Sequence, residues 1–139
     1  MILADTGLLV ALFDPRDRDH AFCVERLRKI KEPLLTTLPV LTEAFHLLKP
    51  HSPGAHGLMR FVADEGLRVW FFDRAALDRA FALMQQYADA PMDLADASLV
   101  TAAETLAIRK VFTLDRKDFS TYRIRRGHRH LSFLLLEDP

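Results

Sequence analysis

The stretch Met92-Asp93-Leu94-Ala95-Asp96-Ala97-Ser98-Leu99-Val100 sets two carboxylates at the start of an apolar helical pattern. Since an α-helix repeats about every 3.6 residues, Asp93 and Asp96 share one face of the predicted helix. Carboxylates in the first turn also suit the positive end of the helix dipole, and Asp93 is a suitable N-cap. The pair is therefore either a charged helix start or part of an acidic site, and the positions of the other acids decide between the two.

Short apolar runs alternate with helical patterns along the whole chain. Strands are predicted at Ile2–Ala4, Leu34–Thr37, Leu67–Phe72, Lys110–Leu114 and Leu131–Leu136. Helices are predicted at Leu8–Phe13, His20–Lys31, Pro39–Leu48, Ala55–Asp64, Arg74–Tyr87 and Asp93–Ile108. Strands separated by helices lie parallel in one sheet, so the sequence predicts a single α/β domain over residues 1–139 with a mainly parallel central sheet.

Three further acids lie at turning points of this predicted fold. Asp5 follows the first strand and Asp115 follows the fourth, so both lie at the carboxyl edge of the sheet, where ligands bind. Glu43 lies about one turn into the helix after the second strand, which begins at the same edge. Carboxylates gathered there raise one another's pKa, and a hard divalent cation such as Mg²⁺ or Mn²⁺ relieves the repulsion. Such a site acts on phosphate esters, but the packing of the Asp93–Asp96 turn against this edge does not follow from the sequence pattern.

The chain of 139 residues has no net charge, yet its charges are unevenly distributed. Between Arg109 and His130, eight Lys or Arg residues stand against two acids, Asp115 and Asp118. A segment of this kind is either a solvated face or an edge that contacts phosphates. The chain as a whole gives no nucleic-acid signal, and only this segment leaves phosphate contact open.

Cysteine content and hydropathy indicate a cytoplasmic protein. The single cysteine, Cys23, excludes an internal disulfide and any zinc site built on several cysteines. Met1–Asp5 has no basic region and resembles a first strand rather than a signal peptide. No uninterrupted apolar run approaches the roughly 18 residues of a membrane span, so no membrane segment is expected.

Four pieces of the chain combine acids with apolar neighbours: Leu3-Ala4-Asp5-Thr6, Leu41-Thr42-Glu43-Ala44, Asp93-Leu94-Ala95-Asp96-Ala97-Ser98-Leu99, and Phe112-Thr113-Leu114-Asp115 with Asp118-Phe119. In this order and spacing they resemble the PIN-domain nucleases, and among them the toxin ribonucleases of VapBC-type toxin–antitoxin modules. The resemblance covers nearly the whole chain and implies a three-layer α/β/α fold with a sheet of four or five strands. It also implies Mg²⁺- or Mn²⁺-dependent hydrolysis of RNA phosphodiesters, a homodimer, and a small antitoxin that inserts a segment into the active groove.

The resemblance also assigns roles to individual acids. The family's catalytic, metal-binding positions fall on Asp5, Glu43, Asp96 and Asp115. By this resemblance Asp5 and Asp96 hold the main metal ion. Asp115 and Glu43 complete its shell, place a second ion or orient the attacking water. Asp93 is an extra carboxylate that we interpret as an N-cap, with a metal contact as the alternative.

Candidate RNA contacts complete the predicted site. They are Thr6, Arg116, Lys117, Arg123 and Arg125. Thr6, like Thr113, offers a hydroxyl beside the acids, and the basic residues are placed to hold the RNA backbone. The chain departs from the family at Thr121–His130, which is longer and more basic than the usual link to the last strand. This link is either a loop that contacts phosphates, which we favour, or a short extra strand.

Other functions fit the sequence less well. A non-catalytic protein of the same fold, binding RNA or a protein partner, is the main alternative, and the retention of all four acids argues against it. Asp5-Thr6-Gly7 matches the aspartic-protease signature, but those enzymes are all-β. A receiver-type phosphoryl-transfer domain needs paired acids directly after the first strand, where this chain has only Asp5. Trp70, Phe71 and Phe72 are predicted to belong to the strand core rather than to a base-stacking platform.

Overall fold

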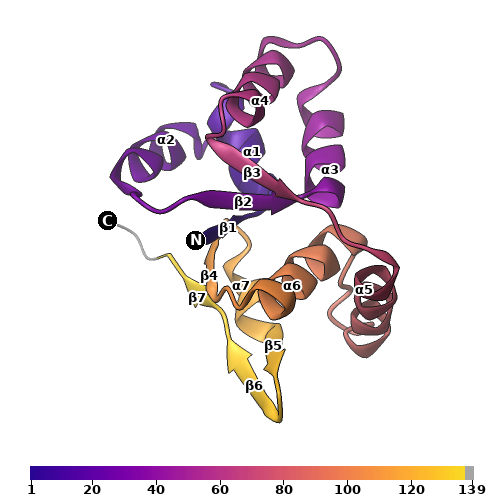
Figure 1. The fold of residues 1–139 in the computed structure, drawn as a ribbon. Coiled ribbons are helices and arrows are strands. Elements are labelled where there is room, and N and C mark those ends of the chain that lie inside the picture. Colours follow the sequence, from indigo (N-terminus) through magenta and orange to yellow (C-terminus); the bar gives the residue numbers. More distant parts are fainter. Residues whose placement is uncertain (137–139) are drawn as a thin grey trace.

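The computed structural model describes residues 1–136, which form three layers around a central sheet (Figure 1). Residues 137–139 of the predicted domain lie outside the described part. The sheet has five strands, and every neighbouring pair is parallel. In spatial order they are β3 Leu67–Trp70, β2 Leu34–Thr37, β1 Ile2–Ala4, β4 Lys110–Phe112 and β7 Leu134–Leu135. The prediction of a three-layer α/β fold with a parallel central sheet is confirmed.

Helices cover both faces of this sheet. Their bounds are α1 Thr6–Phe13, α2 His20–Lys29, α3 Leu38–Leu48, α4 Pro53–Ala63, α5 Arg74–Gln86, α6 Leu94–Leu106 and α7 Arg116–Thr121. Figure 1 shows α1, α2 and α4 on one side of the sheet and α5 and α6 on the other, while α3 contacts both α1 and α6. All six predicted helices form, with ends within two residues of the prediction, but the prediction omitted α7. Within residues 1–136, no helix has the length and apolar character needed to cross a bilayer.

The basic link before the last sheet strand forms an antiparallel hairpin, β5 Arg123–Arg126 and β6 Arg129–Ser132 (Figure 1). Gly127 lies at its tip with a φ of 61°, a left-handed conformation that glycine adopts without strain. Of the two predicted forms of this link, the structure has the extra-strand form, with two strands rather than one. Phosphate contact by the hairpin stays a prediction.

The predicted continuous strand over 131–136 is wrong. Leu131 pairs with Ile124 inside the hairpin, whereas Leu134–Leu135 joins the central sheet beside β4. Phe133, between the two, is buried and packs edge-on against Phe119 at a ring-centroid distance of 5.3 Å. The chain bends where this ring is buried, so the apolar residues before Phe133 belong to the hairpin and those after it belong to the central sheet.

Two other strands end earlier than predicted. β4 ends at Phe112, since the side chain of Thr113 turns toward Asp5. β3 ends at Trp70, and Phe71 in the following loop is 69% exposed. The prediction that Phe71 belongs to the strand core is therefore wrong: β3 is the edge strand, and the chain leaves it there to start α5.

The sheet order places the ends of β1 and β4 at its switch point. From β1 the chain moves outward through β2 and β3, then returns to the other side of β1 as β4. Ligands of open α/β sheets bind outside the carboxyl ends of the strands at such a point, where the connecting segments diverge. Asp5 and Thr113 directly follow these two strands.

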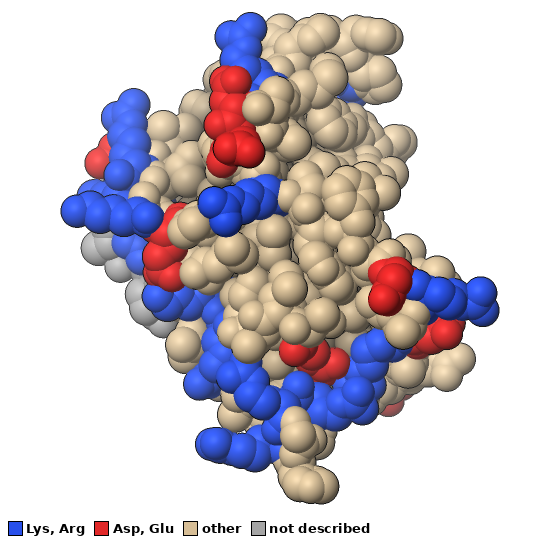
Figure 2. Space-filling view, in the orientation of Figure 1, with Lys and Arg blue, Asp and Glu red and all other residues tan. Residues whose placement is uncertain are grey.

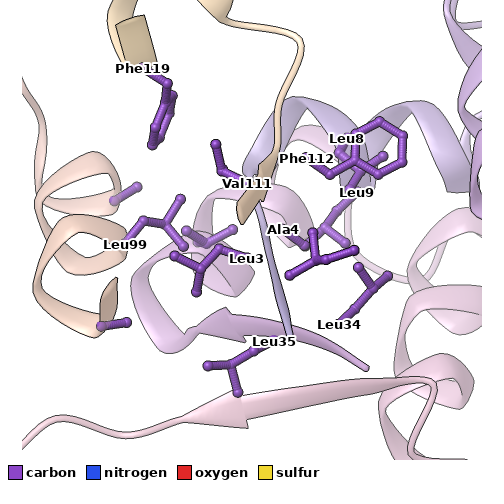
Figure 3. Packing of buried hydrophobic residues seen from close by; sticks show 14 of the residues in the cluster. Leu3, Ala4, Leu8, Leu9, Leu34, Leu35, Leu99, Val111, Phe112 and Phe119 are labelled. Carbon is purple, nitrogen blue, oxygen red and sulfur yellow. The ribbon is translucent and has the colours of Figure 1, made fainter. Parts of the chain in front are cut away.

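α6 is packed into the core rather than laid on its surface. Figure 3 shows Leu99 of this helix on one side of Leu3 and Val111, with Leu8 and Leu9 on the other side. The buried residues of α6 are mostly small, which allows the helix to lie close to the sheet: Ala95, Ala97, Ser98, Leu99, Val100, Thr101, Ala102 and Ala103. The first turn of α6, which carries Asp96, is therefore held firmly.

Candidate active site

Six carboxylates line one cavity of about 510 Å³ at the switch point, and we call it the acidic cavity. Its lining residues are Asp5, Thr6, Gly7, Glu43, Leu47, Pro91, Asp93, Asp96, Leu114, Asp115 and Asp118. The fold thus gathers the four predicted catalytic acids and Asp93. It adds Asp118, which the family match included but to which sequence reasoning gave no role.

Asp5 is the most buried of these acids, with only 7% of its surface exposed. Its Oδ1 accepts a hydrogen bond from the Thr6 backbone N–H at 2.7 Å, and its Oδ2 accepts one from the Thr113 hydroxyl, also at 2.7 Å. Burial raises the pKa of Asp5 to about 6, although the bonds from Thr113 and Thr6 act in the opposite direction. The negative charges of Asp115 and Glu43 raise this pKa further. The carboxylate is thus fixed at both oxygens and costly to ionise.

Asp96 faces the same cavity from the first turn of α6. Burial raises the pKa of Asp96 to about 7, and the charges of Asp93 and Asp5 add to the effect. Its Oδ2 accepts a hydrogen bond from the Tyr122 hydroxyl at 3.0 Å, which lowers the pKa in part. Asp93 Oδ1 accepts the Asp96 backbone N–H at 2.8 Å, so the interpretation of Asp93 as the N-cap of α6 is confirmed. A metal contact by Asp93 stays a prediction.

Tyr122 is the member of this arrangement that sequence reasoning missed. Its side chain is fully buried and packs edge-on against Tyr87 and Phe119, with ring centroids 5.3 and 5.2 Å away. Burial and the nearby Asp96 charge raise the pKa of its hydroxyl, which therefore stays a donor. The spacing from Phe119 to Tyr122 is that of any apolar helix face, so nothing in the sequence separates this tyrosine from ordinary core.

The remaining acids lie nearer to solvent. Asp115 caps α7 by accepting the Asp118 backbone N–H at 3.2 Å, and its own N–H donates to the Thr113 hydroxyl at 2.9 Å. The pKa of Asp118 is raised, chiefly by its interaction with the Asp115 side chain. Glu43, on α3, is half-buried.

The candidate RNA contacts are divided between two places. Thr6 lines the acidic cavity, and its buried Oγ1 has no hydrogen-bond partner among residues 1–136. Arg116 and Lys117 are exposed on α7, where Arg116 Nη1 donates to the Leu136 carbonyl at 3.0 Å. Arg123 Nη1 donates to the carbonyl groups at the end of α7, the shortest at 2.7 Å, so part of this guanidinium is already engaged. Arg125 is exposed on β5.

An adjoining cavity of about 630 Å³ extends the site, and we call it the apolar cavity. It shares Glu43 and Asp93 with the acidic cavity. The rest of its lining is Leu38, Pro39, Thr42, His46, Phe71, Phe72, Leu94 and Ala95. The predicted site is thus one end of a longer groove.

The donor set of the acidic cavity is chemically suited to a hard divalent cation, because it offers carboxylate and hydroxyl oxygens. Three of the acids, Asp5, Asp96 and Asp118, have raised pKa values, and the Thr6 hydroxyl is buried without a described partner. A bound cation would stabilise the ionised form of these carboxylates and would offer the Thr6 hydroxyl oxygen a partner. Within residues 1–136, no three His, Cys, Asp or Glu side chains are arranged so that they could hold a metal ion. Such an open set fits Mg²⁺, which takes one or two carboxylates and keeps several waters.

The fold and the cavity together define a parallel α/β protein with an acidic site at the sheet's switch point. The chain belongs to the PIN domain family, whose model matches residues 2–124. Ribonuclease VapC26 of Mycobacterium tuberculosis is 27% identical over 124 residues, which make up 88% of this chain and 92% of that protein.

Solved structures support the same fold. The crystal structure of M. tuberculosis VapC20, a sarcin–ricin-loop-cleaving toxin, matches with a TM-score of 0.77 and 18% identity, covering 85% of this chain and 92% of that one. A toxin–antitoxin complex from Klebsiella pneumoniae matches with a TM-score of 0.65 and 22% identity, covering 86% and 91%. At these identities the likeness establishes the arrangement of the chain, and activity has to be argued from the site.

Proposed function

We propose that this protein is a divalent-metal-dependent endoribonuclease that hydrolyses RNA phosphodiester bonds and is the toxin of a toxin–antitoxin pair. The observation that carries the proposal is the pair Asp5 and Asp96, a buried and a half-buried carboxylate with raised pKa values that face one cavity in a PIN domain. The ribonuclease VapC26, similar over nearly the whole length of both chains, supports the same reaction.

Mg²⁺ or Mn²⁺, when bound among these acids, would activate water, screen the phosphate charge and stabilise the leaving oxygen. The chain's own part is to present oxygens in fixed positions. The Thr113 hydroxyl and the Thr6 N–H donate hydrogen bonds to Asp5, and the Tyr122 hydroxyl donates one to Asp96. Asp96 and Asp5 are the proposed metal-binding pair.

Glu43 and Asp115 lie nearer to solvent, where they can accept hydrogen bonds from the attacking water and orient it toward phosphorus. In the hydrolysis, the attacking water loses a proton to solvent and its oxygen bonds to phosphorus as the bond from phosphorus to the leaving oxygen breaks; the leaving oxygen takes up a proton from solvent, so one water is added across the bond. Lys117 and Arg125, both exposed, are proposed to hold the RNA backbone, together with the unengaged part of Arg123.

Partners follow from the same proposal. The toxin–antitoxin complex from Klebsiella pneumoniae, a similar structure, supports a small antitoxin, which would place a segment over the acidic and apolar cavities and so exclude RNA. We also propose a homodimer that acts on cytoplasmic RNA. Light scattering on the purified chain tests the dimer, and co-purification with the product of a neighbouring small gene tests the antitoxin.

The decisive experiment is cleavage of structured RNA by the purified protein with Mg²⁺, with Mn²⁺ and with a chelator. Cleavage is expected only with metal, and Asp5→Asn and Asp96→Asn are each expected to abolish it while circular dichroism shows an unchanged fold. Asp64→Asn, which removes an exposed carboxylate outside the cavity, is the matched control. Full activity in either cavity variant would refute the site assignment. RNA binding without cleavage would favour the non-catalytic alternative.

A further inference from the structure

A third cavity, with aromatic and charged lining residues, lies on the side of α6 that carries the hairpin. It has a volume of about 490 Å³ and is bounded by the end of β3, by α5, α6 and β5. Its lining includes Trp70, Phe71, Arg79, Glu104 and Arg125. We call it the aromatic–arginine cavity.

One wall of this cavity is built on the Glu104 carboxylate. Arg79 Nε and Nη2 donate to its two oxygens at 2.8 and 3.0 Å, and the Arg125 backbone N–H donates to Oε2 at 2.8 Å. The Glu104 side chain is only 9% exposed. A charge-assisted, two-pronged pair of this kind is geometrically specific, so Glu104 fixes α5 and β5 against α6.

The same anchor leaves a cation available at the cavity. Arg125 is bound through its backbone, while its guanidinium has no hydrogen-bond or ion-pair partner within residues 1–136 and is exposed. Another part of the lining is aromatic: Phe71 is 69% exposed, and half-buried Trp70 packs against Phe72 with ring centroids 5.9 Å apart. Aromatic rings and an unpaired arginine on the lining of one cavity suit a nucleotide, because rings stack on any base and the guanidinium binds phosphate or stacks.

The cavity is also connected to the acidic site. Phe71 lines both the aromatic–arginine cavity and the apolar cavity, and the apolar cavity shares Glu43 and Asp93 with the acidic cavity. The aromatic–arginine, apolar and acidic cavities therefore adjoin one another in that spatial order. Lys and Arg side chains gather over the lower part of the molecule in Figure 2, where Figure 1 places the hairpin. Their positive charge complements a phosphate backbone.

We propose that the aromatic–arginine cavity binds an unpaired nucleotide of the RNA strand that enters the acidic cavity, with its base on Phe71 and Trp70 and its phosphate on Arg125. The inference rests on the proposed function only in taking RNA as the ligand. Arg125, the proposed phosphate contact, lies just beyond residue 124, where the match to the family ends, whereas Trp70 and Phe71 lie within the matched residues.

Trp70 makes the test direct, since it is the only tryptophan in the chain. Its fluorescence is followed in the full-length protein during titration with single-stranded RNA of about 12 nucleotides, and with the duplex of the same sequence. Chelator in the buffer prevents metal-dependent cleavage. Single-stranded RNA is expected to quench Trp70, and the duplex is expected to quench it much less, because its bases are already stacked and paired.

Two variants with matched controls locate the effect. Phe71→Ala is expected to weaken single-strand binding about tenfold, which corresponds to the loss of one base–aromatic stack. Phe81→Ala is its control, because Phe81 is an exposed ring of α5 that does not line the cavity. Arg125→Gln is expected to reduce the slope of log K against log salt by about 0.7, the value for one phosphate contact on a single strand. Arg68→Gln, an exposed arginine of β3 outside the cavity, controls for net charge.

Several results would overturn the subsite: no quenching by single-stranded RNA, equal quenching by the duplex, or equal losses in the variants and their controls. A changed oligomeric state of Phe71→Ala with unchanged RNA affinity would assign the cavity to a second copy of the chain instead. Cleavage with metal but no quenching overturns the subsite and leaves the ribonuclease intact. Quenching without any cleavage supports the subsite and overturns the proposed activity.

Discussion

Replacing Asp5 by asparagine removes a carboxylate whose ionisation is opposed by burial, so it changes how the stability of the metal-free protein depends on pH. The pKa of Asp5 is raised from 3.8 to about 6 in the folded protein. The folded state thus binds this proton more tightly than the unfolded chain does. The contribution to stability is fully present below pH 3.8 and is lost as pH rises through about 6.

The size of the effect follows from the same values. A difference of about two pH units, at about 1.36 kcal/mol per unit, corresponds to about 3 kcal/mol in total. About 2 kcal/mol of this is expressed between about pH 4.5 and pH 8, because part is already lost at the lower pH. Asp5 is 7% exposed, so solvent screening removes little of it.

The assay is urea unfolding with chelator, followed by circular dichroism, for the wild type and Asp5→Asn. The free energy of unfolding of the variant minus that of the wild type is expected to rise by about 2 kcal/mol from pH 4.5 to pH 8. Taking this difference cancels groups whose pKa does not depend on the Asp5 charge, which Asp96 does not satisfy, and Asp64→Asn controls for the loss of one negative charge at an exposed position. A difference that does not change with pH would show that burial does not hold the Asp5 proton.

Three further perturbations test other parts of the site. Asp93→Ala removes the N-cap of α6 and is expected to lower the free energy of unfolding by about 1 kcal/mol, while Asp93→Asn keeps an acceptor and stays close to the wild type in urea unfolding. Tyr122→Phe removes a hydrogen bond that lowers the pKa of Asp96, so the acidic limb of the pH–rate profile is expected to move to higher pH. Tyr87→Phe, whose hydroxyl accepts from the Arg123 N–H instead, should leave that limb in place. Leu99→Ala empties a fully buried position, and calorimetry is expected to show a loss of about 2–5 kcal/mol.

The layout of the fold follows from local patterns that a single sequence displays. Short apolar strands separated by helices predict a parallel sheet, and in a parallel sheet Asp5 and Asp115 must emerge at the same edge. The capping role of Asp93 was equally local, because the acceptor and donor lie three residues apart. These features depend on neighbours in the chain, which is why they could be predicted.

Other features depend on contacts between distant segments. Whether Leu131 pairs in a hairpin or in the main sheet is decided by where Phe133 finds a buried position against Phe119, which the run of apolar residues does not encode. The bond from Tyr122 to Asp96 spans 26 residues and uses a side chain indistinguishable in sequence from core. Phe71 looked like strand core because nothing local indicates that β3 lies at the edge of the sheet.

The tight packing of α6 on all sides has a consequence for how this chain tolerates changes in length. A one-residue insertion upstream in the helix turns every later side chain by about 100°, which would swing small buried residues outward and misplace the helix against the sheet. We therefore expect functional variants of this chain to carry no insertions within α6. The β5–β6 tip at Gly127 is open, with nothing within 4 Å of an added Cβ, so segments added there would lengthen the hairpin while leaving the acidic cavity unchanged.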